Sequence, residues 1–184
     1  MFKIGNDNNI VLSVVGFGAD GKDLKERLDT MVNMYKFKHG RPISVEACAH
    51  RLSTILYQKR FFPFQVQAIL GGVDKDGKGA VFSYDPAGCY ERSNCRVAGA
   101  AANLIMPFLD SQVEFNNQYV PSAENGTGSL ERPKELFSRA TVAELVKDAF
   151  DNAAERHIEV GDELQIMLVS KNGLEETFIP LKSD

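Results

Sequence analysis

Residues 68–92 read AILGGVDKDGKGAVFSYDPAGCYER, two strand-like runs that flank a turn rich in glycine and charged residues. The first run, 66–73, is apolar and ends in a Gly-Gly pair. The second run, 80–84, alternates towards a further turn at residues 85–88. Apolar or alternating runs punctuated by such turn residues are typical of a β-hairpin. The stretch therefore predicts a pair of strands in the middle of the chain.

The turn between these runs imitates two ligand-binding motifs. Asp74, Asp76, Gly79 and Asp85 fall at positions one, three, six and twelve of an EF-hand loop, but Lys78 puts an ammonium group where an oxygen ligand belongs. The same turn satisfies G-x-x-x-x-G-K, but a glycine replaces the hydroxyl residue that holds magnesium, and a strand-like run follows instead of a helix. We therefore predict a solvated turn that binds neither calcium nor phosphate.

The rest of the chain alternates strands and helices in groups of two. Ser44 is the predicted N-cap of the second helix, and residues 117–133, rich in Asn, Ser, Gly and Pro, are predicted to form a surface loop. The predicted elements are a strand at 9–15, a helix carrying the apolar positions of 24–35, a helix at 44–60, strands at 66–73 and 80–84, helices at about 98–115 and 142–156, and a closing hairpin of 164–170 and 175–181.

Residues 16–21 match G-x-G-x-x-G between a predicted strand and a predicted helix. In a dinucleotide-binding unit the helix returns to a parallel strand that carries an acidic residue about 20 positions on. Here a second helix follows the first, so the crossover cannot be completed. The order of paired helices and paired strands instead favours an α+β fold, a layered helix-sheet-sheet-helix sandwich formed by residues 1–184 as a single domain.

Composition limits the classes of partner. With 43% apolar residues in 184 the chain can bury a core, and its net charge of -4 gives no reason to expect nucleic acid or an anionic membrane as a partner. No apolar run reaches the roughly 20 residues of a membrane span, and no signal peptide pattern is seen, so a soluble intracellular chain is expected. The three cysteines lack C-x-x-C spacing and the three histidines are scattered, so we predict no metal site, and Cys48 is expected to be a buried thiol.

The hairpin stretch also carries a family resemblance. A strand ending in GG-hydrophobic-D, a charged turn with Gly-x-Gly and a strand running into D-P-x-G-x-Y resemble the beta-type subunits of the 20S proteasome, most closely the sixth, non-catalytic type. The resemblance covers nearly the whole chain and includes residues 52–57, 60–63, 99–110 and 152–156. It implies the four-layer fold of N-terminal-nucleophile hydrolases, and it implies that this sequence lacks the N-terminal strands of the family, because its first residues match a point inside the family pattern.

The resemblance further implies a structural subunit without a cofactor. Its expected partners are other beta subunits in a heptameric ring, alpha-ring subunits and the opposite beta ring, and its expected location is the cytoplasm and nucleus. Active relatives have Gly-Ser-Gly-Ser before the third helix, where Ala100 stands in place of the first serine. They also have D-x-x-S-G after the fourth helix, where His157 and Val160 replace the acid and the serine. The alanine and valine side chains cannot relay a proton, so we predict an inactive subunit.

Two further residue sets are candidate contact sites. The resemblance implies that the subunit lies next to the chymotrypsin-like site, and Asp74 is the candidate carboxylate in the wall of that neighbouring pocket. Residues 60–64, Arg-Phe-Phe-Pro-Phe, form an aromatic cluster that fits an interface and a core equally well.

Two other classes of function stay open at this stage. One is a catalytically active threonine protease or amidohydrolase of the N-terminal-nucleophile type whose nucleophile lies outside this sequence. The other is a nucleotide-binding module based on the glycines of 16–21 or 72–78, for which we expect no binding of ATP or NAD.

Overall fold

A computed structural model describes residues 1–5, 9–116, 119–120, 128–129 and 137–182 of the chain. The described residues form two compact units. The first comprises residues 1–99 with 167–176, and the second comprises residues 100–166 with 177–184. None of the helices in these ranges is long and apolar enough to cross a membrane.

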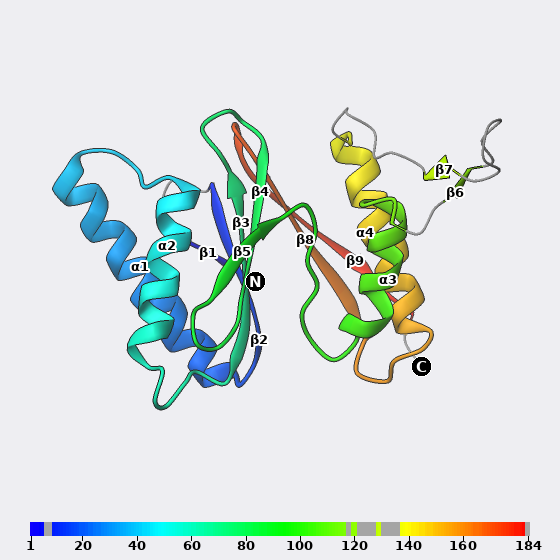
Figure 1. Ribbon diagram of the computed structural model, residues 1–184, viewed down its shortest axis with the longest axis horizontal. Coiled ribbons are helices and arrows are strands. Elements are labelled where there is room, and N and C mark those ends of the chain that lie inside the picture. Colours follow the sequence, from blue (N-terminus) through cyan, green and yellow to red (C-terminus); the bar gives the residue numbers. More distant parts are fainter. Residues whose placement is uncertain (6–8, 117–118, 121–127, 130–136, 183–184) are drawn as a thin grey trace. The chain divides into compact units, whose positions relative to one another are not determined.

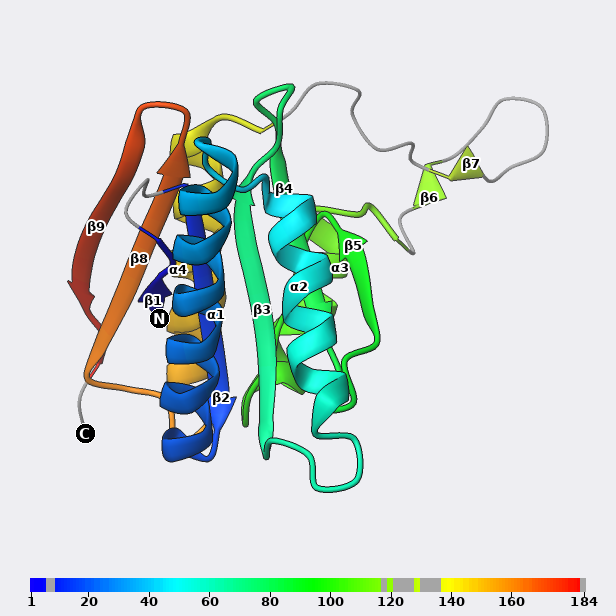
Figure 2. The same ribbon diagram turned by 90° about the vertical axis from the view of Figure 1, so that its left-hand side faces the viewer.

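The first unit is built on a five-stranded antiparallel sheet whose strands lie in chain order (Figures 1 and 2). The strands are β1 (Phe2–Lys3), β2 (Ile10–Gly16), β3 (Val66–Val73), β4 (Gly79–Tyr84) and β5 (Tyr90–Ser93). Leu12 of β2 lies opposite Leu70 of β3, and Leu70 lies opposite Phe82 of β4. Because alternate residues of a strand face the same side, this register gathers three buried side chains on one face.

Two helices, α1 (Gly18–His39) and α2 (Val45–Gln58), cover one face of this sheet (Figure 2). The predicted cap is confirmed, because the Ser44 hydroxyl accepts a hydrogen bond from the Ala47 amide at 3.3 Å. Helix α1 ends at Gly40, whose φ of 63° suits the left-handed C-terminal position that glycine fills without strain. Leu24, Leu52 and Leu56, which belong to the core formed by the helices and the sheet, have no exposed surface.

The second unit contains the helices α3 (Ala102–Gln112) and α4 (Arg139–Ala154), which pack against each other. The Ser138 hydroxyl caps α4 by accepting from the Thr141 amide at 3.1 Å. After α4 the chain forms a hairpin of β8 (Glu163–Ser170) and β9 (Gly173–Pro180), whose two-residue connection requires antiparallel strands. The tip of this hairpin belongs to the first unit and its base to the second.

The structure confirms the α+β class and most predicted elements. Some elements differ from the prediction, and β1 is one of the strands that it lacked. The third helix is shorter than predicted, because residues before Ala102 form a turn in which Gly99 has a φ of 111°. The fourth helix begins earlier, at the cap Ser138, and strand β5 was not predicted. Most of the loop predicted at 117–133 lies outside the described residues. Two short strands of this range are described, β6 (Tyr119–Val120) and β7 (Gly128–Ser129), and they pair with each other.

Candidate functional site

The turn between β3 and β4 is organised by Asp74. One carboxylate oxygen, Oδ1, accepts hydrogen bonds from the amides of Asp76 at 3.0 Å and Lys78 at 2.9 Å. The other, Oδ2, accepts from the Arg92 guanidinium on β5 at 2.8 Å. The Asp74 side chain is only 9% exposed. Sequence reasoning placed this carboxylate at a partner's pocket, and in this chain it holds the turn and the neighbouring strand together.

These contacts also set the protonation of the turn. The hydrogen bond from Arg92, followed by that from the Lys78 amide, holds the pKa of Asp74 below its ordinary value, because both donors favour the ionised carboxylate. Asp74 is therefore charged at neutral pH, and it fixes the guanidinium of Arg92, whose side chain remains 45% exposed. What the turn presents outward is thus a fixed backbone shape and a positioned cation.

The turn does not have the structure of either ligand-binding motif that its sequence resembles. Both Asp74 oxygens are engaged within the chain, Oδ1 by two amides of its own turn and Oδ2 by Arg92. Gly77, at a φ of 79°, lies against the Lys171 side chain of the β8–β9 turn. Lys78 is followed directly by strand β4, and not by the helix that a phosphate loop requires. No group of three His, Cys, Asp or Glu side chains suited to a metal ion occurs in the described ranges.

The glycine-rich turn at residues 16–21 joins β2 to α1. Gly16 has a φ of 118°, and a Cβ there would lie 2.5 Å from the Gln65 carbonyl oxygen, so this position admits no side chain. The Asp20 carboxylate accepts a hydrogen bond from the Gln65 amide at 2.8 Å. Helix α1 is followed by α2, as predicted, and not by a parallel strand. The turn therefore binds the start of β3 and has a structural role in this chain.

The two segments in which the resemblance implies replaced catalytic residues both belong to the second unit. Ala100 is exposed in the turn just before α3, and its methyl group offers no donor or acceptor. His157 and Val160 lie in the turn after α4, where the Val160 amide donates to the His157 carbonyl oxygen at 3.1 Å. The His157 Nδ1 atom accepts a hydrogen bond from the Glu159 amide at 3.2 Å. The imidazole thus closes its own turn.

A polar cavity of about 500 Å³ lies beside His157. Its wall includes an ion pair between Lys182 and Glu155, with 2.8 Å between Nζ and Oε1. Ile158, in the same turn, is 99% exposed. The cavity combines charged side chains with a local turn but contains no serine, threonine or cysteine among its lining residues, so it lacks the hydroxyl or thiol nucleophile of hydrolytic sites.

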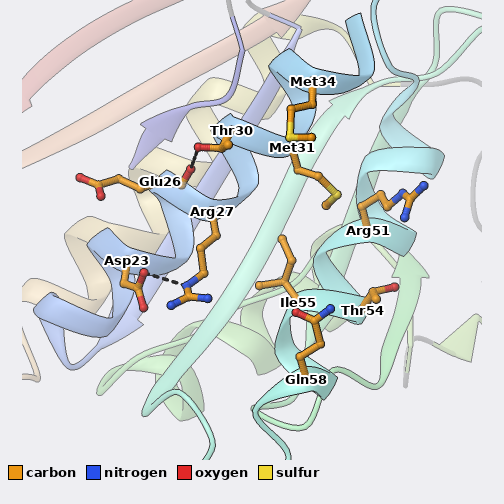
Figure 3. A pocket seen from close by; sticks show the side chains of 10 residues that line it. All are labelled: Asp23, Glu26, Arg27, Thr30, Met31, Met34, Arg51, Thr54, Ile55 and Gln58. Carbon is orange, nitrogen blue, oxygen red and sulfur yellow. Dashed lines mark hydrogen bonds and ion pairs between the residues drawn. The ribbon is translucent and has the colours of Figure 1, made fainter. Parts of the chain in front are cut away.

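A groove of about 480 Å³ runs between α1 and α2 on the outer side of the helix pair (Figure 3). Met31 points from α1 towards α2, where Ile55 lies, and these side chains give the groove an apolar floor. Charged groups border it, including an ion pair of 2.8 Å between Arg27 Nε and Asp23 Oδ1. An apolar floor with a charged border is the composition of a protein-docking surface. Sequence periodicity had assigned Met31 to the buried face and did not reveal the groove.

Cys48, predicted to be a buried thiol, is completely buried in α2. Burial, with a smaller contribution from the charge of Asp29, raises the pKa of its thiol to about 12, so the reactive thiolate form is suppressed. The residue that sequence reasoning missed is Arg92. A cation on a strand that pairs with β4 can reach the β3–β4 turn, so Arg92 could have been proposed as the partner of Asp74. It was missed because β5 itself was not predicted.

Comparison with known proteins adds to this geometry. The family model of proteasome subunits matches residues 1–124. Proteasome subunit beta type-6 of Saccharomyces cerevisiae is 48% identical over 178 residues, which cover 96% of this chain and 73% of that protein. Proteasome subunit beta inpE of Emericella nidulans is 48% identical over 97% of this chain and 74% of its own length. Probable proteasome subunit beta type-6 of Schizosaccharomyces pombe is 43% identical over 99% of this chain and 79% of its own length.

Proposed function

Because the chain belongs to the proteasome subunit family, we propose that it is a structural, non-catalytic beta subunit of the 20S core particle. Membership of the family carries the N-terminal-nucleophile hydrolase fold and assembly into a proteasome complex. The proposed contribution of this subunit to ATP- and ubiquitin-dependent protein degradation is to complete the ring and to shape the neighbouring chymotrypsin-like site.

The observation that carries the non-catalytic assignment is the chemistry at Ala100, His157 and Val160. A nucleophile of this family needs hydroxyl and carboxylate partners that accept and return a proton. A methyl group and an isopropyl group occupy two of those positions, and at the third the imidazole nitrogen accepts a bond from the Glu159 amide. These three side chains support the proposal of an inactive subunit.

The proposed partners follow from the same premise. The chain would occupy one place in a heptameric beta ring, with two beta neighbours, an alpha-ring subunit and the opposite beta ring in contact with it, in the cytoplasm and nucleus. The groove between α1 and α2 is one surface whose composition suits such a contact. The alternative, an active protease of the same family, is not favoured by the type-6 relatives or by the three replaced residues.

Asp74 remains the proposed wall residue for the neighbouring site, with a more specific role. Its carboxylate is engaged within its own chain, so it would act on the neighbouring pocket as a positioning residue that fixes the β3–β4 turn and Arg92. Replacing it would therefore change the shape and charge that the turn presents, without removing a group that touches the substrate.

The assignment as non-catalytic is tested by covalent labelling. Particles purified from the cells of origin are treated with an electrophilic probe that reacts with N-terminal threonine nucleophiles, and labelled subunits are identified by mass spectrometry. We expect label on other beta subunits and none on this chain. Label on this chain that depends on native folding would overturn the assignment.

The role at the neighbouring site is tested by Asp74→Asn in the assembled particle. The amide keeps an acceptor for the turn but weakens the ion pair with Arg92, so the substrate preference of the chymotrypsin-like site should change while the other two sites keep theirs. Asp85→Asn is a matched control, because Asp85 holds the β4–β5 turn in the same way, by accepting from the Cys89 amide at 2.8 Å. Identical kinetics at all three sites in the Asp74 variant would contradict the role.

A further inference from the structure

A second candidate contact surface lies at the end of the first unit where α2 leads into β3. Four aromatic side chains with at least half of their surface exposed lie on the last turn of α2, on this connection and on the adjacent β2–α1 turn, and together they are called the aromatic corner. They are Phe17 at 57%, Tyr57 at 59%, Phe61 at 98% and Phe62 at 83% exposure. Phe64, two residues further on, is 1% exposed. The structure therefore separates the predicted aromatic cluster into one core ring and a pair that no part of this unit covers.

The backbone of the corner is held by regular hydrogen bonds. The Arg60 amide donates to the Tyr57 carbonyl at 3.0 Å, and the Phe62 amide donates to the Lys59 carbonyl at 2.9 Å. The Phe17 amide donates to the Gln65 carbonyl at 2.9 Å, which ties the two turns of the corner to each other. The exposed rings thus project from a backbone that is already ordered, and little backbone entropy remains to be lost when they are covered.

The charge of the corner indicates the chemistry of what covers it. The Arg60 guanidinium lies 5.8 Å from the Tyr57 ring centroid and 5.9 Å from the Phe61 ring centroid. Within the described part of the chain Arg60 forms no ion pair, whereas Lys59 lies 3.9 Å from the Asp23 carboxylate. A cation stacked on exposed rings and lacking a carboxylate is complementary to an apolar pocket bordered by acidic side chains.

The area is sufficient for the centre of a stable contact. Two phenylalanines that are almost fully exposed offer roughly 350 Å² of aromatic surface, taking about 200 Å² for each side chain. A stable interface buries about 800 Å² on each partner, and its affinity is concentrated in a few aromatic and arginine residues near the centre. Phe61, Phe62 and Arg60 have the composition of such a centre.

We propose that the aromatic corner inserts into an apolar pocket, bordered by carboxylates, on a neighbouring subunit of the assembled particle. This inference rests on the proposed function, because it takes a proteasome subunit as the occupant. The corner then serves as an anchor of assembly, with Phe61 and Phe62 filling the pocket and Arg60 pairing with its acidic border. It is separate from the β3–β4 turn, which lies at the opposite end of β3.

The experiment uses the full tagged chain in its own cells, with Phe61 replaced by the photo-reactive amino acid p-benzoylphenylalanine. The native side chain is 98% exposed, so the larger ring costs no core packing. Irradiated particles are analysed for the cross-linked peptide. We expect a cross-link to another subunit of the particle, at a peptide that contains apolar and acidic residues. A cross-link to a lipid, to a second copy of this chain, or to no protein would overturn the inference.

A variant series gives an independent readout. F61A/F62A, co-expressed with the unchanged chain, should enter particles about tenfold less often, as expected for hot-spot truncation. R60E should also reduce incorporation, whereas Phe37→Ala, at a ring 92% exposed on α1, should not. Incorporation of F61A/F62A at the level of the unchanged chain would refute the anchor while leaving the subunit assignment intact. If the unchanged chain itself were missing from particles, the proposed function would fail instead.

Discussion

The two helix pairs of this chain differ in how much of themselves they bury. In the first unit, α1 and α2 bury ten residues against the sheet, whereas in the second unit α3 and α4 bury only two each, Ile105 and Leu109 on one helix and Ala149 and Ala153 on the other. Leu104 on α3 and Val142 on α4 are 46% and 40% exposed. The first pair is therefore anchored by its own sheet, although Phe37 on α1 is 92% exposed, while the second pair buries few side chains of its own.

This contrast shows which part of the chain supplies most of its folding stability. The continuous hydrophobic core found among the described residues belongs to the first unit and joins the sheet to α1 and α2. Residues that complete this core should affect folding directly. Apolar residues of the second unit should matter less for folding of the chain.

The largest expected effect comes from cutting into the first core. Leu52→Ala removes a side chain with no exposed surface and leaves a cavity, so the free energy of unfolding should fall by about 2–5 kcal/mol. Leu104→Ala makes the same chemical change at a half-exposed position and should cost less than about 1 kcal/mol. Thermal unfolding of the purified particles and cellular levels of the tagged chains measure both. Equal losses for the two leucines would abolish the contrast between the helix pairs.

A smaller effect is expected from crowding a turn. Gly88 has a φ of 90°, and a Cβ there would lie 2.5 Å from the Ser53 carbonyl oxygen, so Gly88→Ala should destabilise the chain by about 1–3 kcal/mol. Gly161→Ala in the second unit is the matched change, because the nearest atom lies at 3.7 Å and the backbone is not left-handed. Gly161→Ala should leave the unfolding temperature unchanged. The same measurement would contradict this account if the Gly161 variant unfolded earlier than the Gly88 variant.

The smallest expected effect concerns ion pairs. The lowered pKa of Asp74 means that its stabilising contribution is present above the ordinary carboxyl value near 3.9 and is lost as the pH falls through the pKa in the folded chain. Asp74→Asn should therefore lower the unfolding temperature at pH 7, and the difference should shrink as the pH falls below about 4 and vanish below the lowered pKa of Asp74 in the folded chain. In the second unit, Lys182 pairs with Glu155 in the open, so Lys182→Met should change nothing measurable. A deficit of the Asp74 variant that persists undiminished at low pH would exclude the ion-pair explanation.

The sequence could predict elements that have strong periodicity or clear caps. Strand β3 was predicted with its observed bounds because its apolar run ends in two glycines, and α2 was located by Ser44. The start of α4 was missed because its first turn, Arg-Ala-Thr at 139–141, has no large apolar side chain from which the helical periodicity could be read. Strand β5 is short and has no alternation of buried and exposed residues, so only its pairing with β4 identifies it.

The candidate site was less predictable than the fold. The positions of Ala100, His157 and Val160 came from a family pattern, but the bond between His157 and the Glu159 amide depends on a turn geometry that sequence does not specify. The role of Asp74 in a neighbouring pocket stays a prediction, and its partner Arg92 is 18 residues away and meets it only through the sheet. The exposure of Phe61 and Phe62, next to the buried Phe64, is likewise a property of the fold and not of residue type.

The measurement that tests the central claim most directly is native mass spectrometry of this chain, purified from its own cells through a mild affinity tag. The account predicts recovery in a particle of several hundred kilodaltons together with alpha- and beta-type proteasome subunits. Recovery as a free monomer or as a small homo-oligomer would contradict the claim that the chain works as a structural subunit of the core particle.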